Sequence, residues 1–136
     1  MKHKKFLILF PLFALAFGML ACATSVSTAN ISDAWMASDD SGSNRVSSYA
    51  PDAPVFYALV QLNNAPDDTT VKAVWIAVKV EGVDPDFKID ETTITTGKSP
   101  VHFTLENNNP LWPSGDYKVD IYLNDKLDKT ITFSVK

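Results

Sequence analysis

The side chains that most often carry nucleophilic or metal chemistry are scarce in this sequence. The chain of 136 residues has one cysteine, Cys22, and two histidines, His3 and His102. Nucleophilic catalysis requires a nucleophile beside a base, and a zinc or copper centre requires several clustered nitrogen or sulfur ligands. His102 alternates with Val101 and Phe103, which places it on the opposite face from them and toward solvent. The sequence therefore predicts a protein that is not an enzyme, with no catalytic residues, no cofactor and no metal centre.

Two acidic segments contain oxygen ligands of the kind that calcium prefers. One is the segment 39–44, with the sequence DDSGSN, and the other is the acidic run over 84–91. Neither has the spacing of an EF-hand, which places a bidentate Glu at the twelfth position. We interpret both segments as solvated loops, with calcium binding as the alternative.

Residues 1–21 have the pattern of an export signal. A basic segment, MKHKK, precedes sixteen uncharged residues, FLILFPLFALAFGMLA, and this order is typical of a secretory signal peptide. Sixteen residues interrupted by Pro11 and Gly18 are fewer than the roughly 20 that a membrane-spanning helix needs. We therefore predict a signal peptide over 1–21, with an uncleaved anchor helix as the minor alternative.

The apolar segment ends in Met19-Leu20-Ala21-Cys22, which resembles the lipobox of bacterial lipoproteins. The match is imperfect, because that family most often has Leu where this chain has Met19, and Leu20 is larger than the usual occupant. The resemblance implies cleavage before Cys22 and attachment of acyl chains such as palmitate to it. Each buried methylene contributes about 0.8 kcal/mol, so two or three acyl chains hold a protein on a membrane.

Lipid attachment also explains why an exported chain has a single cysteine, which cannot form an intramolecular disulfide. In a Gram-negative cell, the absence of Asp at Ala23 is what the resemblance associates with the outer membrane. The competing interpretation is cleavage at the small residues Ala21 and Ala23, which would release a soluble secreted protein.

From about residue 33 the sequence changes to short apolar segments rich in β-branched and aromatic residues. Clusters of Asn, Asp, Pro, Ser and Gly separate them, and these are strand and turn signals. We predict a flexible tether over 22–32 and a single all-β domain over 33–136. The expected strands are 34–37, 55–62, 70–80, 88–95, 101–105, 116–124 and 130–135. Seven short strands are typical of a two-sheet β-sandwich.

Two features resemble the immunoglobulin-like and fibronectin type III-like sandwich families. Trp75 lies in the third strand, where these domains often carry a core tryptophan. The segment from Trp112 to Tyr117 is similar to the corner at which a tyrosine hydrogen-bonds back to the preceding loop. The intersheet cysteine pair of antibody domains is absent, so stability must come from the core. Its expected members are Phe56, Trp75, Phe103, Tyr117 and Phe133. The two families differ in strand order, and the sequence does not choose between them.

The strand over 70–80 is apolar on both faces. One face holds Val71, Ala73, Trp75 and Ala77, and the other holds Val74, Ile76, Val78 and Val80. One face should be core. The other should be covered by the tether, by the first strand or by a partner.

The charge balance argues against a nucleic-acid partner. The chain has twelve Lys and Arg and sixteen Asp and Glu. Three of the lysines lie in the first five residues, so nine basic and sixteen acidic side chains follow, with a net charge of −7. No concentrated basic patch is present that would release counterions from a phosphate backbone.

Aromatic side chains are the remaining indication of a binding surface. The candidates are Tyr122, Trp112, Trp35 and Tyr57, which together with Tyr49 are expected at strand ends, in loops or at outward-facing positions. Such rings stack on sugars or anchor a protein partner, although Trp112 would instead cap the core beside the tyrosine corner.

We therefore expect a non-catalytic lipoprotein, anchored to a membrane through Cys22, whose immunoglobulin-like domain binds or supports another envelope protein. The alternatives are a carbohydrate- or peptidoglycan-binding module, and an inhibitor of an exported protease that uses the loops 63–68 and 107–115.

Overall fold

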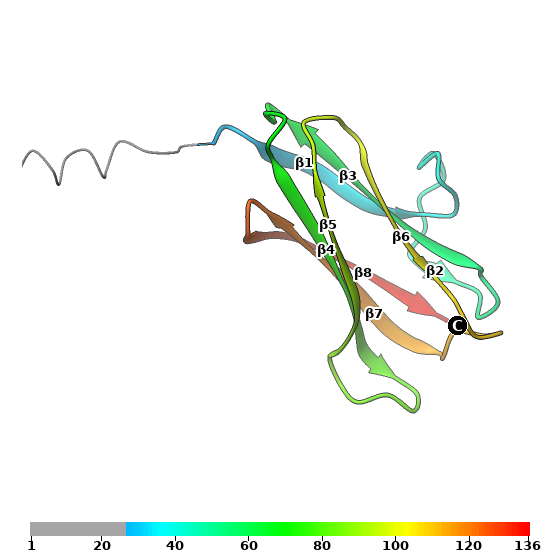
Figure 1. The fold of residues 1–136 in the computed structure, drawn as a ribbon. Helices are drawn as coiled ribbons and strands as arrows, with labels where there is room; N and C mark the ends of the chain where they lie inside the picture. The colour runs from blue at the N-terminus through cyan, green and yellow to red at the C-terminus, as the bar shows by residue number, and fades with distance from the viewer. Residues whose placement is uncertain (1–26) are drawn as a thin grey trace, which may run out of the picture.

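The computed structural model describes residues 27–136, which form two facing β-sheets without a helix in that range (Figure 1). The predicted signal peptide, Cys22 and residues 23–26 of the tether lie outside the described residues. The strands are β1 (Asn30–Ala37), β2 (Ser48–Tyr49), β3 (Val55–Asn63), β4 (Thr70–Val80), β5 (Phe87–Thr95), β6 (Val101–Glu106), β7 (Gly115–Leu123) and β8 (Lys126–Val135). The prediction of an all-β sandwich is confirmed.

One sheet has the order β1-β3-β6 and the other has the order β2-β8-β7-β4-β5. All neighbouring pairs are antiparallel except β2, which runs parallel to β8. In constant-type immunoglobulin domains the fourth long strand joins the sheet of the first two. Here β5 pairs with β4 instead. Strand β5 is therefore the edge strand of one sheet and β6 the edge strand of the other. The two edges lie next to each other but are not hydrogen-bonded.

The core between the sheets contains all five aromatic residues that the sequence predicts there, each 0–4% exposed. Phe133 is at the centre of the aromatic cluster. Its ring centroid lies 5.0 Å from that of Phe56, 5.4 Å from that of Tyr117 and 6.3 Å from that of Trp75. Packed aromatic rings of this kind bury large apolar areas, which stabilises a domain whose described residues contain no disulfide.

The corner before β7 has the geometry that the resemblance implies. The Tyr117 hydroxyl donates a hydrogen bond to the Pro113 carbonyl oxygen at 2.6 Å, and burial raises the pKa of Tyr117. This bond ties the start of β7 to the loop that enters it, as in immunoglobulin-like sandwiches.

Two details of the chain path differ from the expectation. Strand β1 begins at Asn30 instead of residue 34, because Ile31 already faces the core. The segment between β1 and β3, expected as a polar connection, contains the two-residue strand β2. Tyr49 of β2, expected among the exposed aromatic residues, is only 8% exposed, because its hydroxyl donates to the buried Ala37 carbonyl at 2.6 Å and its ring packs in the core.

The second apolar face of β4 is only partly buried, because Ile76 and Val78 are half-buried, while Val80 joins the core after a register shift. Val74 is 8% exposed, and in the strand register it lies between Asp120 of β7 and Glu91 of β5. The first strand, proposed from the sequence as one cover, belongs to the opposite sheet. The first strand therefore does not cover this face, and that part of the prediction is wrong.

Candidate functional site

A loop over residues 38–45 folds back on the outer face of the three-stranded sheet. It is closed by hydrogen bonds from the Ser38 amide to the Asn44 carbonyl and from the Val46 amide to the Met36 carbonyl, both 3.0 Å. Gly42 lies on the side chain of Leu59, which is only 1% exposed. Since Gly42 has a φ of 74° and a Cβ would meet Leu59, only glycine fits this close approach without strain.

Side chains on both sides of Leu59 hold this loop. The Trp35 indole donates to the Gly42 carbonyl at 3.0 Å, and the Arg45 guanidinium lies 4.2 Å from the centre of the Trp35 ring. Arg45 also pairs with Asp33 at 2.8 Å, which keeps the pKa of that carboxyl below its usual value. On the other side, His102 Nδ1 lies 3.0 Å from Asp40 Oδ1.

His102 faces solvent, as its position in the alternating strand predicts, and its contact with Asp40 helps to hold the loop in place. Of the two acidic segments considered for calcium, 39–44 is organised by its own hydrogen bonds, including Ser41 Oγ to Asp39 Oδ1 at 2.6 Å. Within residues 27–136 no group of three or more His, Cys, Asp or Glu side chains could hold a metal ion. The same part of the chain contains no helix long and apolar enough to cross a membrane.

The four aromatic residues that the sequence suggests as a binding surface are not brought together. Trp35 and Tyr57 are half-buried on the outer face of the three-stranded sheet, and Trp35 is already engaged by Arg45. Tyr122 is half-buried on the outer face of the other sheet, where the Lys72 ammonium lies 4.5 Å from its ring centre. These rings do not form one continuous stacking platform.

Trp112 belongs to the core, although it also lines one of the hollows described below. It is 8% exposed and stacks on Phe56 with a centroid distance of 4.2 Å and an interplanar angle of 23°. Its indole nitrogen donates to the Ala53 carbonyl at 2.8 Å, and its amide donates to the Pro51 carbonyl at 2.8 Å. Capping of the core, the alternative interpretation, is the correct one.

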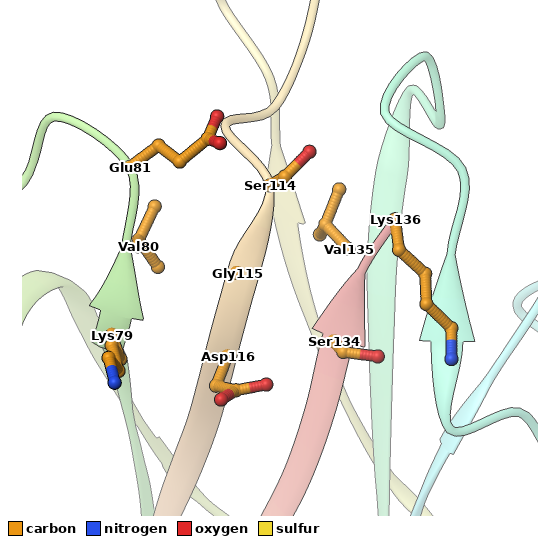
Figure 2. Close-up of a pocket in the computed structure, with 9 residues that line it drawn as sticks. All are labelled: Lys79, Val80, Glu81, Ser114, Gly115, Asp116, Ser134, Val135 and Lys136. Atoms are coloured by element: carbon orange, nitrogen blue, oxygen red, sulfur yellow. The ribbon is translucent and has the colours of Figure 1, made fainter.

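A shallow polar depression of about 710 Å³ lies where β4 ends, β7 begins and β8 ends (Figure 2). Its charged side chains are Lys79, Glu81, Asp116 and Lys136, and Figure 2 shows Asp116 between Lys79 and Ser134, with Glu81 and Lys136 farther apart. Gly115 at its centre has a φ of 150°, and a Cβ there would meet the Lys79 carbonyl oxygen. The depression therefore follows from a close backbone approach between β4 and β7, and mixed charges give it no preference for one ligand class.

A second hollow, the apolar cleft, lies between the start of β5 and the loop 107–113 and has a volume of about 160 Å³. Its lining is mostly apolar: Ala77, Val80, Val83, Phe87, Ile89, Leu111, Trp112, Pro113 and Tyr117, together with Asn107 and Asn109. Phe87 is 52% exposed and Leu111 is 60% exposed, although both are large apolar residues. The other large hydrophobic residue with comparable exposure in the described part is Leu127, at 56%, in the β7–β8 hairpin.

A β-bulge positions Phe87 at this cleft. In the register of β4 with β5, Trp75 pairs with Asp90 but the next residue, Ile76, pairs with Lys88, so Ile89 is the extra residue. Bulges re-aim side chains at sheet edges. After the bulge, Phe87 lies opposite Ala77, whose side chain faces the core.

A third hollow, the acidic depression, adjoins the apolar cleft on the flank between β5 and β6. It has a volume of about 400 Å³ and is lined by Ile89, Asp90, Thr104, Leu105, Glu106 and Asn108. Ile89 lines both hollows. Two exposed carboxylates, Asp90 and Glu106, therefore lie beside an apolar cleft.

Comparisons with known proteins support the class of fold. No protein-family model matches the chain, and no curated protein matches it. An immunoglobulin-like protein from Pseudomonas aeruginosa has a similar structure, with a TM-score of 0.57 and 14% identity, over 83% of this chain and 100% of that one. The chain is an immunoglobulin-like β-sandwich.

A second similar structure is the alkylpurine DNA glycosylase AlkC from Pseudomonas fluorescens, bound to DNA containing an abasic site analog. Its TM-score is 0.50 at 12% identity, and the match covers 87% of this chain but 33% of the glycosylase. This chain thus corresponds to about a third of that protein. At sequence identities this low, the structural similarity shows the fold alone, because function depends on particular sites.

Little in the amino-acid sequence indicates the apolar cleft. Leu111 lies in the loop 107–115 that we considered as an inhibitory loop, and its position between Pro110 and the buried Trp112 is the one available signal. Phe87 directly follows a turn and is paired through a bulge, which period-two alternation cannot anticipate.

Proposed function

We propose that this chain is an exported, non-catalytic lipoprotein, anchored through Cys22, whose immunoglobulin-like domain binds another protein of the cell envelope. The observation that carries the binding role is the apolar cleft. Phe87 and Leu111 leave large apolar areas in contact with water at one place on the surface. Exposed apolar side chains that converge on a hollow are typical of interaction sites.

The positions of the apolar cleft and of the start of β1, at opposite ends of the sandwich, support this proposal. Strand β1 begins at Asn30 and pairs there with Asn63, at the same end of the molecule as the start of β4. The apolar cleft lies at the other end of β4, beyond Ala77. Eleven residues of strand span roughly 30 Å, so an anchor on Cys22 leaves the cleft facing away from the anchored end.

The lipid anchor is tested with Cys22→Ala. In cells that express the wild-type chain, we expect the protein in the membrane fraction and labelled by radioactive palmitate. Cys22→Ala should remain soluble or retain its signal peptide, and it should take up no label. Wild-type protein recovered entirely from the soluble fraction would show that the small-residue cleavage at Ala21 and Ala23 is the correct interpretation.

The binding role is tested by chemical crosslinking in intact cells, followed by mass spectrometry of the co-purifying proteins. A discrete envelope protein that is enriched with wild type, and reduced when Leu111 is replaced by Ser, supports the proposal. Leu127→Ser is the matched control, because it removes an equally exposed leucine at the opposite end of the sandwich. Equal recovery of the partner with both variants would contradict a role for the cleft.

Inhibition of an exported protease is a second candidate, favoured by the exposure of Leu111 in the loop 107–115. A substrate-like loop must present such a side chain to an enzyme cleft. A panel of exported serine and cysteine proteases, assayed with the purified chain, tests this function, and loss of inhibition in Leu111→Ser would assign it to this loop.

A further inference from the structure

The apolar cleft and the adjoining acidic depression combine an apolar pocket with two carboxylates, and this combination favours a particular kind of partner. The cleft is small and its floor consists of core residues such as Trp112 and Tyr117, so it accepts one large apolar side chain. Exposed Phe87 and Leu111 flank that position. Anchoring side chains that fill such a pocket contribute most of the energy of a protein interface.

The charge around the cleft is predominantly negative. Exposed carboxylates flank it on two sides. Asp84 and Asp86 lie in the turn between Val83 and Phe87, which line the cleft, and Asp90 and Glu106 line the adjoining acidic depression. The nearby cations are Lys88 and Lys79. Lys88 is paired with Glu91 at 2.8 Å, and Lys79 lines the polar depression on the other side of β4.

Two other occupants fit this surface less well. A second copy of the chain would bring the same carboxylates against each other, and like charges placed together at an interface are unfavourable. An anionic lipid surface would be repelled for the same reason. In addition, the cleft lies at the end of the sandwich away from Asn30 and hence away from the proposed anchor.

We propose that the apolar cleft docks an aromatic or aliphatic side chain from an exposed segment of a partner protein, and that a neighbouring lysine or arginine of the same segment binds in the acidic depression between Asp90 and Glu106. This inference rests on the proposed function, which it makes specific by giving the chemistry of the partner. The apolar side chain supplies affinity, and the basic side chain supplies orientation and specificity.

The probe is a random peptide library displayed on phage, selected against the full chain as the cell exports it, purified from whichever fraction contains it. Because the probe is a peptide, the result does not depend on the lipid anchor or on a natural partner. We expect the enriched peptides to place Lys or Arg within three positions of an aromatic or aliphatic residue. A synthetic copy of the most enriched peptide is then used to measure affinities by calorimetry.

Replacing both Phe87 and Leu111 by Ser should weaken binding of this peptide about tenfold or more. Asp90→Asn combined with Glu106→Gln should weaken it by about threefold to tenfold and reduce its dependence on salt concentration. Leu127→Ser is the matched control for the apolar anchors. Asp68→Asn combined with Asp128→Asn removes two exposed charges elsewhere on the domain, and neither control should change the affinity.

Four results would overturn the proposal. The first is a failure to enrich any peptide, and the second is enrichment of neutral or acidic peptides. The third is binding that the cleft variants do not change although thermal unfolding shows that they are folded. The fourth is a dimer, detected by sedimentation, that the Phe87 and Leu111 replacements dissociate, which would assign the cleft to a second copy. Failure of the crosslinking experiment alone would instead count against the proposed function.

Discussion

Tyr49 joins the short strand β2 to the rest of the sandwich, and its replacement by Phe is a sharp test of the structure. The hydroxyl donates to the Ala37 carbonyl at 2.6 Å and lies 3.4 Å from the Tyr57 amide. The ring packs 4.6 Å from the Phe56 ring and 5.7 Å from the Phe133 ring. Tyr49→Phe retains these ring contacts and removes only the hydrogen bonds.

The expected cost follows from burial. Ala37 is 0% exposed, so water cannot readily replace the lost donor. Loss of a buried hydrogen bond that leaves its partner unsatisfied costs about 1–3 kcal/mol, and we expect the free energy of unfolding to fall by about 2 kcal/mol. In a domain of this size that corresponds to a melting temperature lower by about 10 °C.

The same hydroxyl predicts a dependence on pH. Burial raises the pKa of Tyr49 from 10.0 to about 12. The folded state therefore holds the phenolic proton more tightly than the unfolded state, so this stabilisation is complete below pH 10 and is lost as the pH rises toward 12. By pH 11 the stability difference between wild type and Tyr49→Phe should shrink by about 1 kcal/mol.

Urea unfolding followed by tryptophan fluorescence at pH 8 and pH 11 measures both effects. Tyr122→Phe is the control, because Tyr122 is half-buried on the outer face and its ring contact with Lys72 does not need the hydroxyl, so the free energy of unfolding should change by less than about 0.5 kcal/mol. Equal stabilities of Tyr49→Phe and Tyr122→Phe, or a difference from wild type that does not change with pH, would refute the position assigned to β2.

Two further substitutions test the backbone approach and the aromatic core by thermal unfolding. Gly115→Ala should destabilise the domain by about 3 kcal/mol or more, because a Cβ would meet the Lys79 carbonyl. Gly82→Ala should cost only about 1 kcal/mol, since its φ of 73° is strained for alanine but no atom lies within 4 Å; equal effects would contradict the approach of β4 to β7. Phe133→Ala should cost about 3–5 kcal/mol as a buried core truncation, whereas the half-exposed Phe87→Ala should cost about 1 kcal/mol or less; the reverse order would show that the core is elsewhere.

Alternation of apolar and polar residues was sufficient to predict most of the sandwich. It identified β6 with the correct faces, because one side of this strand lies in the core, and Val101, Phe103 and Leu105 are all buried. The resemblance at Trp112–Tyr117 also predicted the hydrogen bond from Tyr117 to Pro113. These features are local, so a short segment of sequence contains all the information that they need.

Features that depend on distant contacts were not predictable. Strand β2 has two residues, and its pairing with β8 and the bond from Tyr49 to Ala37 connect segments far apart in the chain. The sequence suggested that Trp112 caps the core, but not that its indole donates to the carbonyl of the distant Ala53. The cleft depends on a bulge at Ile89 and on the distance between two sheet edges, and neither has a sequence signature.

Site-specific photo-crosslinking in living cells tests the central claim, that an anchored domain binds an envelope protein through the apolar cleft. A photoreactive phenylalanine analogue is placed at Leu111 in one strain and at Leu127 in a control strain, each with and without Cys22→Ala. We predict a discrete crosslinked envelope protein at Leu111 that is absent at Leu127 and lost with Cys22→Ala. The same crosslink at both positions, or no crosslink at Leu111 in the anchored protein, would contradict the account.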